Sequence, residues 1–422
     1  MIILNKTSSF NANNACQPVH ELSWIQVFFM LCTLAFLISQ AQAQTSEQQV
    51  LRPTVQTLMK ATQEAYSGKN YDQALGFVNE LLKISDLTSI ERITTFRMRA
   101  AVENTLQNWD AVIETLEVVV DRKELSAIEK WSVLEGLISA AQKKKDYRRV
   151  VVWSRVYIDG NGPKSTIRTA LVQALSAQNE HQQVVDQVNK FILADSRVQV
   201  KTNEQELKLM AIAYKSLNNE AGYADLISKL LSLYPSKIYW KEAVGNIARK
   251  HDFNTRLTLD LYRLLESADC LDDSDSYLEM VNHALKNGFP VEAQRVLQKG
   301  ITGGFFANDD HVKDHNKLRE DIQKRVQEDD KLPEIALSAQ NSNGLFAIGE
   351  LQLSKQNWQA AHDAFSKAAA LGGVRRENEL WLHDSIALFK LGQIAKALQQ
   401  LKKIQGDETI ANISKLWEQF IR

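Results

Sequence analysis

Apolar residues recur along the chain with the spacing of paired helices. Nine segments share a polar turn and an aromatic or apolar anchor residue, and most carry further apolar residues three, seven and ten positions later. The middle segments match less well, since Ser154 and Arg256 occupy such positions. The anchors are Tyr71, Trp109, Tyr147, His181, Tyr223, Phe253, Pro290, Trp358 and Ile394. Offsets of three, seven and ten place side chains on one face of an α-helix. Each anchor therefore predicts a helix with one buried face.

A second large apolar residue precedes most anchors by thirteen positions. These residues are Leu58, Phe96, Leu134, Met210, Trp240, Tyr277, Leu345 and Trp381. A constant offset between two apolar helices predicts a helical hairpin with a fixed loop. Successive anchors are 38, 38, 34, 42, 30, 37, 68 and 36 residues apart. Because 68 is about two periods, one further unit is expected between Pro290 and Trp358.

These spacings resemble the tetratricopeptide repeat, a helix-turn-helix unit of about 34 residues that stacks into a superhelix. The clearest match is Leu345-x-x-Ile348-Gly349 followed by Trp358, Ala361, Phe365 and Ala368. The resemblance implies an all-α, superhelical α-solenoid of about ten hairpins. The residues expected in the repeat core are Tyr71, Ala74, Trp109, Tyr147, Trp240, Pro290, Ala293, Trp358, Ala361, Phe365, Ala368, Trp381 and Ala397.

Composition agrees with a mostly helical protein that does not bind nucleic acid. The 422 residues include only 17 glycines and 6 prolines, whereas usual shares are about 7 % and 5 %. A chain so poor in turn-forming residues is expected to be mostly helix. A formal net charge of -1 argues against a nucleic-acid partner, which normally requires a basic excess.

The N-terminus resembles an export signal. Residues 24–38 are almost entirely apolar, and Ala41-x-Ala43 offers the small residues that a signal peptidase accepts. We expect a signal peptide over residues 1–43, cleaved after Ala43, with a retained membrane anchor or a cytosolic protein as alternatives. Cleavage would leave Cys270 as the one cysteine of the mature chain, and a lone thiol is expected to be buried.

The expected organisation beyond the signal has four parts. Tetratricopeptide-like repeats cover residues 44–304 and C-terminal repeats cover 341–405. Between them, residues 305–340 are rich in charge, and the sequence leaves open whether this stretch is a stacked degenerate repeat or a projecting insertion. Residues 406–422 are expected to form a capping helix, because Ile413, Leu416, Trp417 and Phe420 share one helical face.

Residues 230–305 resemble a narrower group, the periplasmic tetratricopeptide proteins found beside TonB, ExbB and ExbD. The resemblance rests on Tyr234-Pro235-Ser236-Lys237-Ile238-Tyr239-Trp240, Leu259-Asp260-Leu261, residues 271–278, Gly288-Phe289-Pro290-Val291-Glu292-Ala293 and Val296-Leu297-Gln298-Lys299-Gly300. A weaker likeness continues over 341–405. It implies a periplasmic accessory to the motor that drives outer-membrane transport, and it brings no catalytic residues.

Three segments with candidate chemistry have simpler structural explanations. His311 and His315 have the spacing of a metal-binding pair, but no third ligand is evident. The acidic segment 269–279 has no glycine where a calcium loop needs one and is expected to cap a helix. Residues 160–166 do not match the spacing of a phosphate loop and are expected to form a turn and a helix cap. No catalytic, cofactor-binding or metal-binding residue and no cofactor is therefore expected.

The sequence thus favours a non-enzymatic periplasmic scaffold or adaptor that binds protein partners, with TonB, ExbB or ExbD as candidates. No small-molecule substrate is expected, membrane contact would arise only through partners, and the partner-binding residues stay unassigned. An assembly factor for exopolysaccharide, pili or outer-membrane proteins is the alternative. A murein-cleaving enzyme built on a helical platform is disfavoured, because the repeat frame runs to Ile404 and leaves no room for a catalytic domain.

Overall fold

The computed structural model describes residues 52–123, 125–306, 312–329 and 341–422. The expected signal peptide lies outside the described residues and stays a prediction. The described chain contains helices and turns and no strand. It divides into an N-terminal unit that ends at Asn219 and a C-terminal unit that begins at Glu220.

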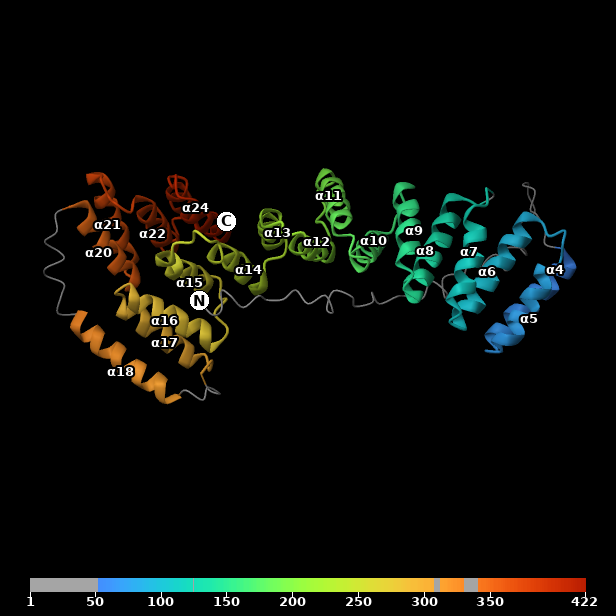
Figure 1. The fold of residues 1–422 in the computed structure, drawn as a ribbon, viewed down its shortest axis with the longest axis horizontal. Helices are drawn as coiled ribbons and strands as arrows, with labels where there is room; N and C mark the ends of the chain where they lie inside the picture. The colour runs from blue at the N-terminus through green and yellow to red at the C-terminus, as the bar shows by residue number, and fades with distance from the viewer. Residues whose placement is uncertain (1–51, 124, 307–311, 330–340) are drawn as a thin grey trace. The chain divides into compact units, whose positions relative to one another are not determined.

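The N-terminal unit is a run of helices that pack against their neighbours in the chain (Figure 1). Its helices are α4 (Pro53–Ser67), α5 (Tyr71–Leu82), α6 (Ser89–Thr105), α7 (Trp109–Val120), α8 (Ala127–Lys144), α9 (Tyr147–Asp159), α10 (Thr166–Ala177), α11 (His181–Arg197) and α12 (Glu204–Ser216). Each helix from α5 to α11 contacts both the preceding and the following helix. The predicted all-α repeat of tetratricopeptide-like hairpins is thus confirmed.

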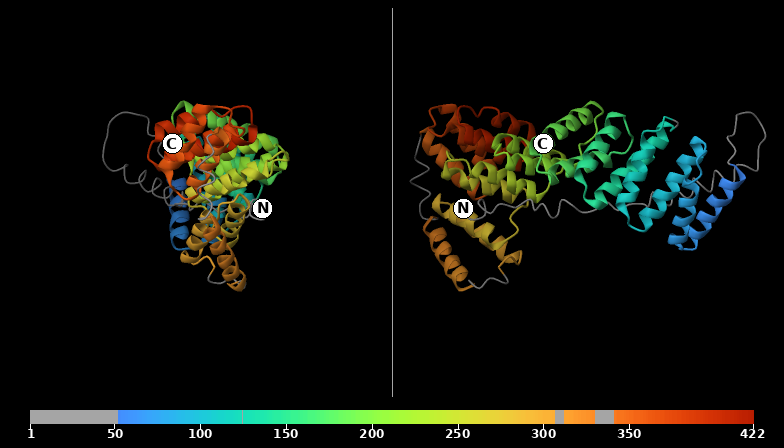
Figure 2. Two further views of the ribbon diagram at one scale, coloured as in Figure 1. Left: turned by 90° about the vertical axis from the view of Figure 1, so that its left-hand side faces the viewer. Right: turned by 45° about the vertical axis from the view of Figure 1, so that its right-hand side comes forward.

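The C-terminal unit continues the hairpin pattern and also brings distant segments together. Its helices are α13 (Glu220–Leu233), α14 (Lys237–Ala248), the short 3-10 helix η2 (Thr255–Leu257), α15 (Thr258–Ser267), α16 (Ser274–Lys286), α17 (Pro290–Thr302), α18 (Val312–Asp329), α20 (Ser342–Ser354), α21 (Trp358–Leu371), α22 (Glu377–Lys390), α23 (Ile394–Leu401) and α24 (Glu408–Ile421). Figure 2 shows the red helices at the C-terminus lying against the yellow-green helices α14 and α15.

The hairpin turns share one backbone geometry, which explains the constant loop. Seven anchors are the first residues of the second helices α5, α7, α9, α11, α17, α21 and α23. The residue two positions before each of these anchors has a positive φ: Lys69 60°, Gln107 58°, Lys145 61°, Asn179 59°, Gly288 79°, Gln356 60° and Gly392 75°. The next N–H then donates to the carbonyl five residues earlier, as from Asn70 to Ala65 at 2.8 Å. This left-handed cap ends the first helix and satisfies its free carbonyls.

Small residues allow the helices of a hairpin to approach closely. Ala74, Ala293, Ala361, Ala368 and Ala397 are fully buried, as is Phe365. Trp240 and Pro290 are also buried. The other expected core residues, Tyr71, Trp109, Tyr147, Trp358 and Trp381, are half-buried. Their rings therefore cover the apolar seam and keep one edge in solvent.

Helix caps in the N-terminal unit also connect successive hairpins. The Thr88 side chain caps α6 through a capping box with Glu91. The Arg52 guanidinium, 39 residues upstream, binds the same carboxylate at 2.7 Å. Hydrogen bonds from Arg52 and the cap hold the pKa of Glu91 at about 2. Glu129 repeats this arrangement with Arg97 at 3.0 Å, so the cap carboxylates lie at hairpin junctions.

The segments singled out for possible chemistry fall in turns and caps. Residues 160–165 form the turn between α9 and α10, but the Ser165 side chain at the start of α10 makes no capping hydrogen bond. Asp273 caps α16 by accepting a hydrogen bond from the Ser276 N–H at 2.8 Å. Cys270 is a free, fully buried thiol, and burial raises its pKa to about 11, so it is a weak nucleophile at neutral pH. The pair of His311 and His315 lies outside the described side chains.

Two helices of the C-terminal unit, α18 and α24, lie in segments whose packing the sequence did not specify. α18, in the charged stretch 305–340, packs against α17. α24, in the range of the expected capping helix, contacts α14, α15, α22 and α23. The Phe420 ring of α24 lies 5.8 Å from that of Trp240 in α14. The last helix thus packs against residues far upstream as well as against its own hairpin.

No helix in the described ranges combines the length and the apolar character needed to span a bilayer.

Two helical glycines provide a matched test of hairpin packing. A methyl group at Gly349 would lie 2.4 Å from the Phe365 ring, whereas one at Gly76 would have no atom within 4 Å. We expect Gly349→Ala to destabilise the fold by roughly 1–3 kcal/mol because the core is overpacked. Gly76→Ala, on the exposed face of α5, should stabilise it by up to about 1 kcal/mol.

Thermal unfolding followed by far-UV circular dichroism measures both effects. Equal melting temperatures for the two variants would contradict the close contact between α20 and α21.

Candidate functional site

Helix α15 is unusual because it is buried on all sides. Every residue from Thr258 to Leu265 is buried. Two of them, Asp260 and Arg263, are charged and only 4 % and 7 % exposed. A buried ion requires a partner, since the effective cost of removing it from water is several kcal/mol. The partners of these two residues determine what surrounds α15.

Arg263 joins α15 to α17. Its guanidinium makes two parallel hydrogen bonds to Glu292, Nε to Oε1 at 2.9 Å and Nη2 to Oε2 at 2.7 Å. A third hydrogen bond, from Nη1, reaches Asp260 at 3.1 Å. This planar, bidentate pairing is the geometry in which arginine binds carboxylates most specifically.

Asp260 joins α15 to α22. The His383 Nε2 lies 2.9 Å from Asp260 Oδ1, across 123 residues of sequence. His383 Nδ1 lies 3.7 Å from Glu350 Oε1 of α20. Burial acts to lower the pKa of His383, but Asp260 and Glu350 outweigh burial, so the pKa is raised. Although burial acts to raise the pKa of Asp260, His383 and Arg263 hold it below its usual value.

The network of charges continues toward the surface. Arg376 donates to Glu350 at 2.7 Å and to Glu379 at 3.2 Å. Arg256, just before α15, also donates to Glu379. Burial raises the pKa of Glu379 despite these cations. Helices α15, α17, α20 and α22 are therefore joined by one set of alternating charges.

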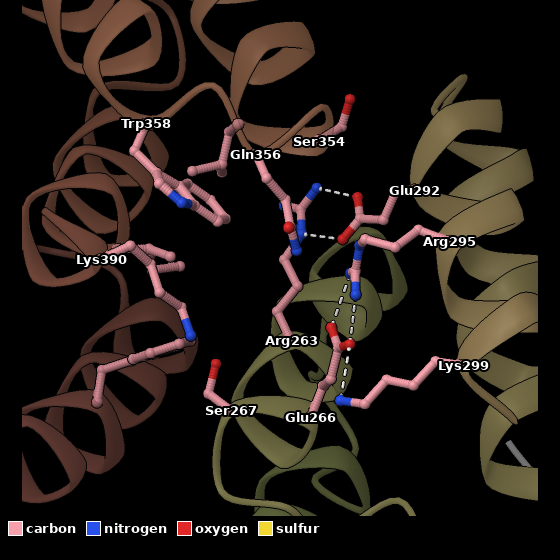
Figure 3. Close-up of a pocket in the computed structure, with 13 residues that line it drawn as sticks. Arg263, Glu266, Ser267, Glu292, Arg295, Lys299, Ser354, Gln356, Trp358 and Lys390 are labelled. Atoms are coloured by element: carbon pink, nitrogen blue, oxygen red, sulfur yellow. Dashed lines mark hydrogen bonds and ion pairs between the residues drawn. The ribbon is translucent and has the colours of Figure 1, made fainter. Parts of the chain in front are cut away.

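A cavity of about 230 Å³ lies beside this network (Figure 3). It is lined by Arg263, Glu266, Ser267, Glu292, Arg295, Lys299, Leu353, Ser354, Gln356, Trp358, Ile386, Lys390 and Trp417. These residues come from α15, α17, α20, the turn after α20, α21, α22 and α24. We call this space the C-terminal cavity.

Four cationic side chains and two carboxylates line the C-terminal cavity. Glu266 accepts hydrogen bonds from Arg295 Nη2 at 2.8 Å and from Lys299 Nζ at 3.3 Å. Arg295 and Lys299 together hold the pKa of Glu266 below its usual value, against the effect of burial. Four cationic side chains and two carboxylates, each paired with an arginine, give the lining a formal excess of two positive charges.

A second, more open hollow of about 750 Å³ lies at the start of α22. Arg256, Arg375, Arg376, Lys402 and Lys403 contribute to its lining, together with Trp381. The Lys403 ammonium lies 4.0 Å from the centre of the Trp381 ring. This cation–π contact neutralises no charge. Glu377, Glu379 and Asp407 also line the hollow, so its five cations leave a formal excess of two positive charges.

Of the expected core residues, Trp358 lines the C-terminal cavity and Trp381 lines the open hollow. The other expected core residues line neither space. Sequence reasoning missed the charged residues of the cavity. One signal was present: Asp260 and Arg263 lie three positions apart within the mainly apolar run from Leu257 to Leu265. This spacing places the two charges on one helical face.

No cluster of three or more histidine, cysteine or carboxylate side chains suited to a metal ion occurs within the described residues. The arginines of the cavity are held by carboxylates in fixed geometry. The arrangement is therefore suited to binding and orienting an anionic group.

No protein-family model and no curated protein matches the chain. Solved structures that align with it include yeast Tom70, at 12 % identity over 87 % of this chain and 96 % of that one, with a TM-score of 0.26. Another is Naa15/Naa10 bound to HypK-THB, at 12 % identity over 86 % of this chain and 66 % of that one, with a TM-score of 0.31. A third is the APC/C hetero-tetramer Cut9–Hcn1, at 13 % sequence identity over 82 % of this chain and 73 % of that one, with a TM-score of 0.18. These values carry no inference about function.

The buried pair of His383 and Asp260 predicts a pH-dependent stability. Because the folded-state pKa of His383 is raised above the unfolded value of about 6.5, its contribution is fully present below that pH. The contribution is lost as pH rises through the folded-state pKa. We expect His383→Gln to destabilise the C-terminal unit by roughly 1–3 kcal/mol at pH 5.5 and by less at pH 9.

Hydrogen–deuterium exchange of peptides from α15 and α22, together with thermal midpoints, measures this difference. His251→Gln, at an exposed histidine, is the matched control and should show no such trend. A difference between wild type and His383→Gln that grows with pH would contradict the prediction.

Proposed function

We propose that this chain is a non-enzymatic scaffold that binds protein partners. The observation that carries the proposal is the repeated hairpin itself. Buried alanines and aromatic residues pack each hairpin, and cap carboxylates bind arginines of a neighbouring hairpin. Stacking thus occupies the inner faces of the helices and leaves their outer faces as an extended surface.

An extended surface of this kind is suited to long or flexible partners. Each hairpin offers a modest contact area, and many such contacts add along the array. A partner that orders on binding loses conformational entropy, which lowers its affinity but allows regulation. Many weak contacts rather than one deep pocket would then determine specificity.

The finer proposal is that the scaffold acts in the periplasm as an accessory to a TonB–ExbB–ExbD system. It is supported by the signal-like segment that ends at Ala43 and by the resemblance over residues 230–305. The periplasmic part of TonB is the kind of extended partner that a hairpin array would bind. An assembly factor for exopolysaccharide, pili or outer-membrane proteins is the alternative under the same fold.

Site-specific photo-crosslinking in the native host, under iron limitation, tests this proposal. Val152 and Val150 lie on the same helix, α9, but Val152 is 53 % exposed and Val150 is fully buried. A photoreactive residue at 152 should capture protein partners, whereas the same residue at 150 should not. Further exposed positions, such as Ile128 at 81 %, extend the scan along the unit.

Mass spectrometry of the captured proteins and of the N-terminus separates the outcomes. TonB, ExbB or ExbD, with a mature end at Gln44, is the expected result. Recovery of a secretion or polymer-assembly complex would favour the alternative scaffold. An intact N-terminus with cytosolic partners would overturn the periplasmic assignment, and capture of nothing along the whole scan would overturn the scaffold itself.

A further inference from the structure

The C-terminal cavity has the size of a small ligand. Its volume of about 230 Å³ equals that of roughly eight water molecules at about 30 Å³ each. The cavity lies between helices from separate parts of the unit. Figure 3 shows Trp358 and Lys390 on one side, and Glu266, Arg295 and Lys299 on the other.

One wall of the cavity is cationic and held in place before any ligand binds. Arg263 is fixed by Glu292, and Arg295 is fixed by Glu266. Guanidinium groups that are already oriented lose little entropy when they bind an anion. The two carboxylates are occupied by these contacts, so they add little repulsion toward a ligand that approaches from the cavity.

Lys390 supplies a charge that the network does not neutralise. Its ammonium lies 5.5 Å from the centre of the Phe389 ring, and it forms no ion pair with the described residues. Although Lys390 is exposed overall, desolvation of its ammonium lowers its pKa, and Glu266 only partly opposes this effect. An anion bound near Lys390 would compensate for that desolvation.

The cavity also has an apolar wall, which is formed by Leu353, Trp358, Ile386 and Trp417. Trp417 is fully buried. A ligand with an apolar body would remove the other side chains of this wall from water.

We propose that the C-terminal cavity binds an organic anion, namely a carboxylate carried on an apolar chain or ring. The carboxylate lies among Lys390, Lys299 and Arg295, and the apolar body lies against Trp358 and Ile386. Two sources share this chemistry: a free organic acid, and the terminal carboxylate of a protein chain that ends in a large apolar residue. The inference does not depend on the proposed scaffold function.

Isothermal titration calorimetry of the full chain with phenylacetate tests the site. Phenylacetamide, which keeps the ring and replaces the charge, is the matched ligand control. We expect saturable binding of phenylacetate and at least about tenfold weaker binding of phenylacetamide, since a charged hydrogen bond contributes more than a neutral one.

Substitutions locate the binding in the cavity. Lys390→Gln should weaken phenylacetate binding about tenfold or more, whereas Lys396→Gln, at an exposed lysine of α23 outside the cavity, should leave it unchanged. Lys299→Gln, on the opposite wall, is a second test. Lys390 and Lys299 are both exposed, so the variants should fold, and circular dichroism checks this.

The tripeptide Gly-Gly-Phe, with a free or an amidated C-terminus, distinguishes the two sources. Tighter binding of the free terminus than of phenylacetate supports a chain terminus, and binding of phenylacetate alone supports a free acid. The proposal is overturned if neither ligand binds saturably, if phenylacetamide binds as well as phenylacetate, or if Lys390→Gln and Lys396→Gln have the same effect.

Discussion

Charges inside an apolar helix constrain how α15, α17 and α22 pack in the C-terminal unit. Asp260 and Arg263 lie within α15, which is buried on every side. Leaving either ion without a partner would cost on the order of 3–5 kcal/mol. The partners come from two other helices, Glu292 from α17 and His383 from α22. Packings that displace α17 or α22 are thereby disfavoured, and the C-terminal cavity lies among the helices that these pairs hold together.

The repeat could be predicted from sequence because its determinants are local. Seven of the nine anchors mark the starts of second helices, since the residue two positions earlier adopts a left-handed conformation that closes the first helix. The other two do not, because Tyr223 is the fourth residue of α13 and Phe253 precedes η2. Glycine adopts this conformation readily, as at Gly288 and Gly392, whereas at Lys145 the Cβ makes the left-handed conformation unfavourable. The polar turn, the anchor and the buried alanines all act within one hairpin, so their spacing is visible in the chain.

The packing of α24 and the candidate site could not be predicted in the same way. A repeat frame specifies contacts between neighbours, but Glu408 of α24 pairs with Lys250 at 2.6 Å across 158 residues. The spacing of the repeats gives no indication of this contact between α24 and Lys250. The cavity residues come from six helices and one turn, and a lysine such as Lys390 has no local feature that separates it from other surface lysines. The charged pair within α15 is the one feature of the site with a signal in the sequence, namely two charges three positions apart among apolar residues, and sequence reasoning missed it.

The C-terminal cavity and the outer faces of the hairpins can act independently, and this separation has a physical consequence. A ligand that touches α15 and α17 on one side and α21 and α22 on the other stabilises the folded C-terminal unit by mass action. It does so without contacting any protein that lies on the outer surface. If the unit samples looser packings in which α15 is less covered, the ligand shifts the population toward the closed packing. Partner binding would respond to the ligand only if the partner also distinguishes these packings, because coupling between two sites requires a difference in affinity for two states.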